Sequence, residues 1–245
     1  MMPLRIGILM DHPSPHMVAL LGSLAERDDC VADVIYLGKS ASERKWGAPL
    51  GKLSSRFIPG FSFLGGGRRM NPGITHALRK QQADVWVVNT CYDSPSTVLA
   101  AWLLGRRTPW VYMNEPPRPR NRLFTASKSF PFQFVAGRAW GLIGMGEKAA
   151  EIYSRGRNGC VPTTSVPYFI DLKPFYELPG AGEPEPGKPV HFLSCCQMIH
   201  RKGLDVLLQA CSRLTDPNWQ LTLMGGGPLR RKLEREFRER FSAQQ

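Results

Sequence analysis

Short apolar segments alternate with helical patterns along this chain, and this alternation restricts its fold more than any other feature. Residues 4–10 and 85–89 are apolar runs of strand length, and between them apolar residues recur three and four positions apart, as over residues 17–24. Strands that alternate with helices are typical of crossover units, whose strands pair in parallel. The sequence therefore predicts an α/β fold with a doubly wound parallel sheet.

The order of the predicted elements supports this interpretation up to residue 177. We expect strands over residues 4–10, 31–37, 85–89, 110–113 and 142–145, and helices over residues 17–24, 73–82, 94–104 and 147–153. Residues 38–70 interrupt the alternation, because they are rich in Gly, Ser, Lys and Arg, and only Phe57 and Ile58 resemble a short strand. Loops of this length are usually functional or mobile.

A segment rich in Pro, Gly and Glu, residues 178–189, predicts an interdomain linker. Residues 1–177 then form a first Rossmann-like domain, and residues 190–245 begin a second one. The second has predicted strands over 190–196 and 221–224 and predicted helices over 203–214 and 228–241. Two strands leave an open-edged sheet with uncovered apolar surface, so we expect this domain to be incomplete.

The cysteines and the apolar runs exclude several classes of protein. The six cysteines form no CxxC pair and no Cys/His cluster at zinc-ligand spacing, so neither a metal site nor a disulfide framework is expected. No apolar run reaches the length of about 18 residues that a membrane span needs, and the amino terminus lacks a signal-peptide core. We therefore expect a cytoplasmic protein with reduced thiols.

The net charge of +12 predicts an attraction to polyanions. The basic residues crowd the middle of the chain, at Arg68, Arg69, Arg79, Lys80, Arg106, Arg107, Arg118, Arg120, Arg122, Lys128 and Arg138. A solvated face and a patch that contacts an anionic membrane both fit this cluster. Nucleic acid is not favoured as a partner, because the sequence contains no motif of a nucleic-acid-binding fold.

The segment CCQMIHRKGLDVLLQA, residues 195–210, places a polar, basic loop between a predicted strand and an amphipathic helix. Ligands of parallel sheets bind at the carboxyl ends of the strands, where the N–H groups of the next helix favour anions. Lys202 supplies a positive charge, and Gly203 lets the backbone approach a phosphate closely. Gln197, His200 and Arg201 can face the same position, which makes this loop a candidate phosphate site.

A second strand-to-helix loop follows in the segment LTLMGGGPLRRKL, residues 221–233. Three glycines, Gly225, Gly226 and Gly227, come directly after the predicted strand, and Pro228 stands at a predicted first helical position. Such a turn favours a phosphate or a nucleotide. A tight turn without a ligand is the equally simple alternative.

Together, the two segments resemble the donor-binding domain of GT-B glycosyltransferases of family 4. In that family a strand ending in Gly-Arg-Leu or Gly-Gln-Leu precedes Lys-Gly-x-Asp-x-Leu-Leu-x-Ala, and the next strand precedes Gly-x-Gly-Pro. The residues in register are Gln197, Met198, Lys202, Gly203, Asp205, Leu207, Leu208, Ala210, Gly225, Gly227, Pro228 and Leu233. Gln197 replaces the common arginine, and Cys196 replaces the glycine before it.

The resemblance implies a donor site in this second domain. Lys202 and Gln197 would contact the donor diphosphate, with Arg201 and Gly203 beside them. The three glycines at 225–227, with Pro228, would pass close to the nucleotide.

The first domain resembles the acceptor domain of the same family more diffusely, through GMGEKAAEIY at 144–153 and VPYFIDLKPF at 166–175. In the family, a polar loop closes on an aspartate equivalent to Asp171, for which a turn or helix cap is the alternative. The place of a family histidine that touches the donor sugar holds Asn114 here, followed by Glu115.

Asn114 and Glu115 are therefore the catalytic candidates. A glutamate at the carboxyl end of a strand can orient an acceptor hydroxyl or act as an acid or base, and capping of the loop is the alternative. His16, after the first strand, is a candidate on the acceptor side, although a position at a helix start is the better explanation for it.

The resemblance implies a GT-B fold of two Rossmann-like doubly wound domains, the second incomplete, and a retaining hexosyltransferase activity. Such an enzyme moves a sugar from a UDP- or GDP-sugar to an acceptor hydroxyl in glycan, polysaccharide or glycolipid synthesis, without a cofactor or a metal. The basic first domain suits a lipid-linked acceptor at the inner face of a membrane.

Of two alternatives to a glycosyltransferase, one stays open and the other is disfavoured. The family's paired-glutamate motif, which holds the sugar and ribose hydroxyls, has no match before Gln245, so a truncated, non-catalytic relative that binds a partner is the main alternative. A dinucleotide-dependent oxidoreductase is disfavoured, because no GxGxxG follows the first strand.

Overall fold

The computed structural model describes residues 2–39, 53–62, 68–116, 130–155, 160–168, 170, 172–178 and 187–241. The chain divides into two compact units, Met1–Phe175 and Tyr176–Gln245. Asp171 and most of the predicted linker 178–189 lie outside the described residues, as do Arg118, Arg120, Arg122 and Lys128 of the basic cluster.

Unit 1 is built on a seven-stranded sheet in the order β3-β2-β1-β6-β7-β8-β9. Every pair of neighbouring strands is parallel, which confirms the prediction of an α/β fold with a parallel sheet. The strand order reverses between β1 and β6, so the chain winds outward from there in both directions. The strands are β1 (Leu4–Met10), β2 (Cys30–Tyr36), β3 (Ser54–Phe57), β6 (Val85–Asn89), β7 (Trp110–Asn114), β8 (Gly141–Met145) and β9 (Thr163–Val166).

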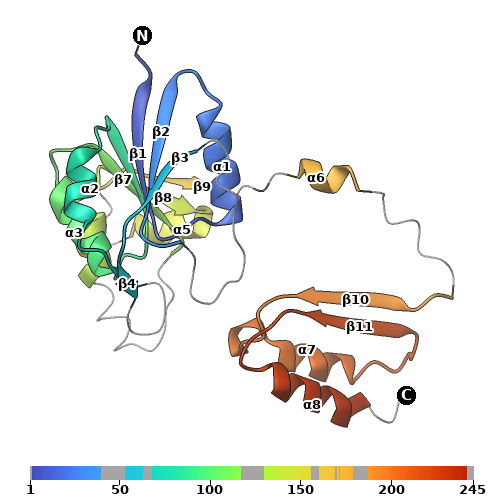
Figure 1. Cartoon of the computed structure of the whole chain (residues 1–245). Helices are drawn as coiled ribbons and strands as arrows, with labels where there is room; N and C mark the ends of the chain where they lie inside the picture. The colour runs from blue at the N-terminus through green and yellow to red at the C-terminus, as the bar shows by residue number, and fades with distance from the viewer. Residues whose placement is uncertain are drawn as a thin grey trace. The chain divides into compact units, whose positions relative to one another are not determined.

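Helices cover both faces of this sheet (Figure 1). Successive side chains of a strand point to opposite faces. Ile8 and Met10 of β1 accordingly pack against α1, whereas Leu9 packs in the cluster that contains α2 and α3. The helices of unit 1 are α1 (Pro15–Ala25), α2 (Ile74–Lys80), α3 (Pro95–Leu104), α5 (Glu147–Tyr153) and α6 (Lys173–Tyr176), whose last residue belongs to unit 2; residues 130–136 are also helical.

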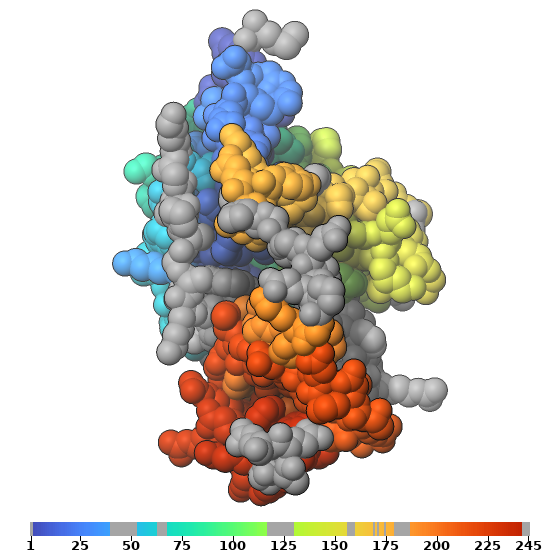
Figure 2. Space-filling view, turned by 90° about the vertical axis from the view of Figure 1, so that its right-hand side faces the viewer, coloured from blue at the N-terminus to red at the C-terminus, as the bar shows by residue number. Residues whose placement is uncertain are grey.

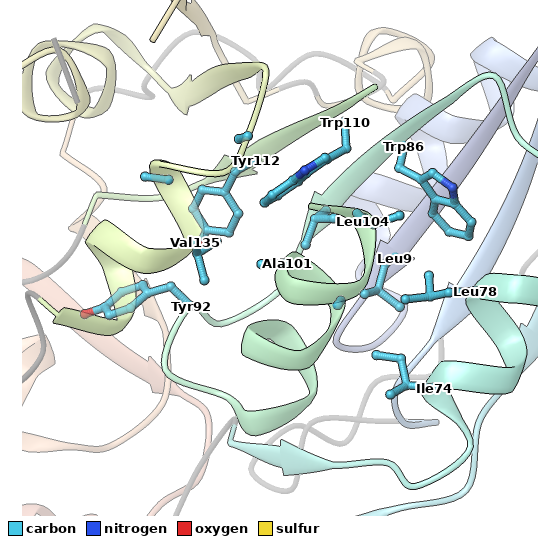
Figure 3. Close-up of a cluster of buried hydrophobic side chains, with 14 of the residues drawn as sticks. Leu9, Ile74, Leu78, Trp86, Tyr92, Ala101, Leu104, Trp110, Tyr112 and Val135 are labelled. Carbon is cyan, nitrogen blue, oxygen red and sulfur yellow. The ribbon is translucent and has the colours of Figure 1, made fainter. Parts of the chain in front are cut away.

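The larger core cluster lies between α3 and the strands β6 and β7 (Figure 3). Ala100 and Ala101 are fully buried, and their small side chains let α3 approach the sheet closely. Trp110 at the start of β7 is also fully buried, and its indole N–H donates to the carbonyl oxygen of Gly105 over 2.8 Å. The core therefore fixes α3 against the amino-terminal half of β7.

Several elements of unit 1 were not predicted as such from the sequence. Residues 38–70 hold, besides β3, a small antiparallel hairpin of β4 (Phe61–Ser62) and β5 (Arg69–Met70). β9, with the polar sequence TTSV, pairs with β8. Residues 130–136 form a helix that buries Phe132, Val135 and Ala136. These segments are short or lie at the edge of the sheet, where apolar periodicity is weak.

Unit 2 contains two parallel strands, β10 (Val190–Cys195) and β11 (Trp219–Met224). The 3-10 helix η2 (His200–Lys202) and the helices α7 (Leu204–Cys211) and α8 (Arg230–Phe241) accompany them. Leu204 and Leu208 of α7 pack with Leu233 and Phe241 of α8 in one core cluster. In the space-filling view, residues 187–241 form one contiguous orange-to-red body (Figure 2).

The two-stranded sheet of unit 2 exposes much apolar surface. Val190, Phe192 and Leu193 of β10 are 58%, 45% and 62% exposed, and Met224 of β11 is 54% exposed. Among the described residues, each of these strands has a hydrogen-bonded neighbour on one side only. None of the described helices combines the length and the apolar character that a bilayer span requires.

Candidate functional site

A cavity of about 170 Å³ opens at the carboxyl edge of the sheet in unit 1. The strand order reverses between β1 and β6, so the loops that follow these two strands lead away in opposite directions. A crevice forms between such loops. The cavity is smaller than a typical cofactor pocket, and its size suits the end of a ligand. It is lined by Met10, Asp11, His12, Ser14, His16, Met17, Asn89, Asn114, Glu115, Met145 and Tyr168.

Asn114 is the last residue of β7, and both the nitrogen and the oxygen of its side-chain amide form hydrogen bonds. Its Nδ2 donates to the carbonyl oxygen of Thr90 over 2.7 Å, and its Oδ1 accepts the backbone N–H of Glu115 over 2.7 Å. Nδ2 also lies 3.1 Å from the hydroxyl oxygen of Tyr112. The side chain of Asn114 therefore fixes the turn that carries Glu115.

Glu115 is exposed and stands on the wall of the cavity. The hydroxyl of Tyr168 donates to its Oε1, and the hydroxyl of Tyr153 donates to its backbone carbonyl over 2.6 Å. Two tyrosines, one at the end of α5 and one just after β9, thus hold the backbone and the carboxylate of Glu115. A carboxylate oriented in this way can accept a hydrogen bond from a hydroxyl group of a ligand.

His16 lies in the first turn of α1, next to Tyr168. Its ring meets that of Tyr168 edge to face, with 5.2 Å between the centroids, and its Nε2 lies 3.5 Å from the hydroxyl oxygen of Ser14. The structure therefore brings together the two catalytic candidates, Asn114 and Glu115, and the acceptor-side candidate His16 around one cavity.

Asp11 is a residue of this cavity that the sequence analysis missed. Its Oδ2 accepts the backbone N–H of Cys91 over 2.8 Å, whereas its Oδ1 is buried without a hydrogen-bond partner among the described residues. Burial raises the pKa of the Asp11 carboxyl to about 7, against the opposing effects of the Cys91 N–H and of Arg69. The position of Asp11 directly after the first strand, at the carboxyl edge, was the available signal.

Part of the basic cluster is neutralised beside this cavity. Arg68 forms an ion pair with Asp93 at 2.8 Å, and the thiol of Cys91 donates to Asp93 over the same distance. Burial and the neighbouring Asp93 raise the pKa of Cys91 to about 12, so this thiol stays protonated. Arg68 is therefore a structural cation.

The first of the two loops predicted to bind the donor runs from β10 through η2 into α7. Lys202 ends η2 and is exposed, as is Arg201. Gly203 follows with φ of 64°, a left-handed conformation that favours glycine, and the helix α7 begins at the next residue. The loop thus presents two cationic side chains just before a helix N-terminus.

The glycine-rich loop after β11, the second loop predicted to bind the donor, is joined to the first by backbone hydrogen bonds. The N–H of Cys196 donates to the carbonyl of Met224 over 3.0 Å, and the N–H of Met198 donates to the carbonyl of Gly226 over 2.9 Å. Gln197 lies between these two donors. The two loops predicted to bind the donor therefore meet at the carboxyl edge of β10 and β11.

Two of the three glycines have a structural reason of their own. A Cβ at Gly225 would lie 2.0 Å from the carbonyl oxygen of Cys196, and one at Gly227 would lie 2.5 Å from that of Met198. A Cβ at Gly226 would meet nothing within 4 Å. Pro228 lies in a turn two residues before α8, and not at the first helical position. The tight-turn interpretation thus explains Gly225 and Gly227 but leaves Gly226 unexplained.

Comparisons with known proteins show which folds the chain is similar to. No protein-family model matches the chain, and no curated protein matches it. Among solved structures, the lipopolysaccharide outer core galactosyltransferase WaaB, in its apo form, superposes with a TM-score of 0.62 at 14% identity, over 97% of this chain and 65% of that one. HepE from Anabaena, in complex with UDP, superposes with a TM-score of 0.65 at 11% identity, over 98% and 66%.

A UDP-N-acetylglucosamine 2-epimerase superposes as well, with a TM-score of 0.58 at 11% identity, over 99% of this chain and 67% of that one. The chain thus has the GT-B fold, which confirms the fold expected from the sequence. It spans about two thirds of the length of these structures. Because an epimerase shares the fold, the fold alone does not select the reaction.

Proposed function

We propose that this chain provides the acceptor side and the phosphate-binding part of the donor side of a glycosyltransferase that uses a nucleotide sugar. The observation that carries the proposal is the pair of hydrogen-bonded loops in unit 2, with Lys202 exposed beside them. The similarity to the UDP complex of HepE supports a nucleotide sugar as the co-substrate. The base of the nucleotide, uracil or guanine, stays open.

In this proposal the donor diphosphate binds to unit 2. Lys202 and Arg201 supply positive charge, Gln197 contributes its amide, and the N–H groups at the start of α7 point toward the phosphates. These groups stabilise the negative charge that grows on the diphosphate as the bond to the sugar breaks. Gly226, which has open space beside it, lets the nucleotide approach the backbone.

The acceptor binds in the cavity of unit 1. Glu115 accepts a hydrogen bond from the acceptor hydroxyl, Asn114 holds the turn that carries it, and His16 lines the same cavity. By its resemblance to family 4, the transfer retains the configuration of a hexose, and needs neither a metal nor a cofactor. We place the protein in the cytoplasm, at the inner face of a membrane, and its product in a glycan, a polysaccharide or a glycolipid.

The alternative is a non-catalytic protein of the same fold, which binds a nucleotide or a partner without transferring a sugar. Release of UDP from UDP-glucose, and of GDP from GDP-mannose, in the presence of sugar acceptors separates the two. The transferase proposal predicts release that Glu115→Gln reduces, and a product whose anomeric configuration, read by NMR, equals that of the donor. Absence of release with every donor favours the binding protein, and an inverted product contradicts retention.

A further inference from the structure

The backbone and the carboxylate of Glu115 are held by different parts of unit 1. The hydroxyl of Tyr153 donates to the backbone carbonyl over 2.6 Å, and Oδ1 of Asn114 accepts the backbone N–H over 2.7 Å. The carboxylate is contacted separately, because the hydroxyl of Tyr168 donates to its Oε1. Tyr153 and Asn114 therefore keep Glu115 on the cavity wall without the help of Tyr168.

Tyr168 is held less firmly than the other tyrosines of this region. It is 46% exposed, whereas Tyr112 and Tyr153, whose hydroxyls also reach the turn at Asn114, are fully buried. Tyr168 comes two residues after β9, which among the described residues is the last strand of the sheet and pairs with β8. Exposed residues at the edge of a sheet open more easily than its core. The ring of Tyr168 can thus leave Glu115 while the core stays intact.

The ring of Tyr168 also covers His16 inside the cavity. The two rings meet edge to face, with 5.2 Å between their centroids, and both residues line the cavity together with Glu115. The phenol thus presents a hydroxyl to the carboxylate and a flat, largely apolar ring to the imidazole. A sugar ring offers the same combination, since its hydroxyls stand beside faces of C–H groups.

We propose that Tyr168 determines which acceptor enters this cavity. Its phenol occupies the place of the acceptor hydroxyl on Glu115, and the acceptor must displace it. This inference rests on the proposed function, because it takes Glu115 as the group that receives the acceptor hydroxyl. The ligand that replaces the phenol supplies a hydroxyl to Oε1 of Glu115 and an apolar face to His16, so the acceptor is a sugar or glycoside whose reacting hydroxyl lies beside such a face.

The same contact discriminates against water. A water molecule can form the hydrogen bond to Glu115, but it cannot replace the contact between the rings of Tyr168 and His16. Specificity arises when the wrong ligand leaves such a cost uncompensated. Tyr168 therefore also protects the donor sugar from hydrolysis while no acceptor is bound.

Tyr168→Phe tests the proposal, because it removes the hydroxyl and keeps the ring. The probes are the methyl α-glycosides of glucose, galactose and mannose, titrated into the full chain without nucleotide and followed by NMR. We expect the variant to bind at least one of them roughly tenfold more tightly than the parent protein, since the phenol no longer competes for a charged acceptor. Tyr176→Phe, at a residue that is 80% exposed and does not line the cavity, is the control and should bind like the parent.

The proposal is overturned if Tyr168→Phe binds none of the three glycosides, if it binds them no better than the parent does, or if Tyr176→Phe improves binding equally. These results require no nucleotide, so they are distinct from failure of the proposed function, in which no donor releases its nucleotide.

Kinetics provide a second readout. In the transfer reaction, Tyr168→Phe should lower the acceptor KM roughly tenfold at a nearly unchanged kcat, and raise the release of UDP from UDP-glucose without acceptor. A fall in kcat at an unchanged KM would show instead that Tyr168 only orients Glu115, and would also overturn the proposal.

Discussion

The backbone N–H of Met198 donates a hydrogen bond to the carbonyl of Gly226 over 2.9 Å and joins the two loops that leave β10 and β11. This bond places the polar loop of Gln197 beside the glycine-rich turn. The glycines of this turn can be required for either of two reasons, close packing of the two loops or space for a ligand. The two reasons make different predictions.

Gly225→Ala should destabilise unit 2. The new Cβ would lie 2.0 Å from the carbonyl oxygen of Cys196, and the residue has a φ of 146°, which L side chains rarely adopt. We expect a loss of at least about 2 kcal/mol in the free energy of unfolding, measured by urea denaturation. A change within about 0.5 kcal/mol would contradict the packing of the two loops.

Gly226→Ala should leave the stability of unit 2 unchanged, because its Cβ meets nothing within 4 Å. If a nucleotide approaches the backbone there, the same methyl group weakens binding. Titration with UDP should show a loss of affinity in a variant that denatures like the parent protein. Unchanged affinity would mean that the nucleotide does not approach Gly226.

The raised pKa of Asp11 predicts that the free energy of unfolding depends on pH. Its pKa is raised by burial from 3.8 to about 7, so between these values the folded state binds more protons than the unfolded state. Stability from this group is therefore present at low pH and falls as the pH rises through that window, by up to roughly 4 kcal/mol.

Asp11→Asn removes this titration while its carbonyl oxygen still accepts the N–H of Cys91. The difference in unfolding free energy between variant and parent, measured by urea denaturation from about pH 5 to about pH 8, should shift in favour of the variant as the pH rises. A constant difference across that range would show that the carboxyl titrates at its ordinary pKa.

Asn71 should be the most sensitive polar residue of unit 1. It is almost fully buried, and its Nδ2 donates to the carbonyls of Leu37 and Ile58, each over 2.9 Å. Asn71→Ala leaves two buried carbonyls without this donor, so we expect a loss of about 2 to 4 kcal/mol in thermal or urea denaturation. Asn218→Ala, at an exposed turn of unit 2, is the control and should change stability by less than about 1 kcal/mol. Equal effects of the two variants would show that the buried hydrogen bonds of Asn71 do not stabilise unit 1 as described.

The sequence predicted the central strands well because their side chains are buried on both faces. The predicted bounds of β1 and β6 agree with the structure at both ends, and apolar runs such as Leu4–Met10 carry a strong signal. β9 was missed, because its sequence TTSV is polar and half exposed, and such strands show little pattern.

The candidate site could be predicted only in part. His16, Asn114 and Glu115 were found because each follows or ends a central strand, and the structure gathers them around one cavity. Asp11 and Tyr168 were missed, since their importance depends on tertiary contacts, the burial of one carboxyl oxygen and a hydroxyl that reaches Glu115 from beyond β9. Apart from the position of Asp11 directly after the first strand, no pattern in the sequence records such contacts.

Titration of the purified chain with UDP and with GDP tests the central claim most directly. The account predicts saturable binding of one of them, weakened at least tenfold by Lys202→Ala, since a hydrogen bond to a charged group is lost. Arg213→Ala, which removes an exposed charge after α7, should bind like the parent protein. Absence of binding, or equal loss in both variants, would contradict a donor site at the paired loops of unit 2.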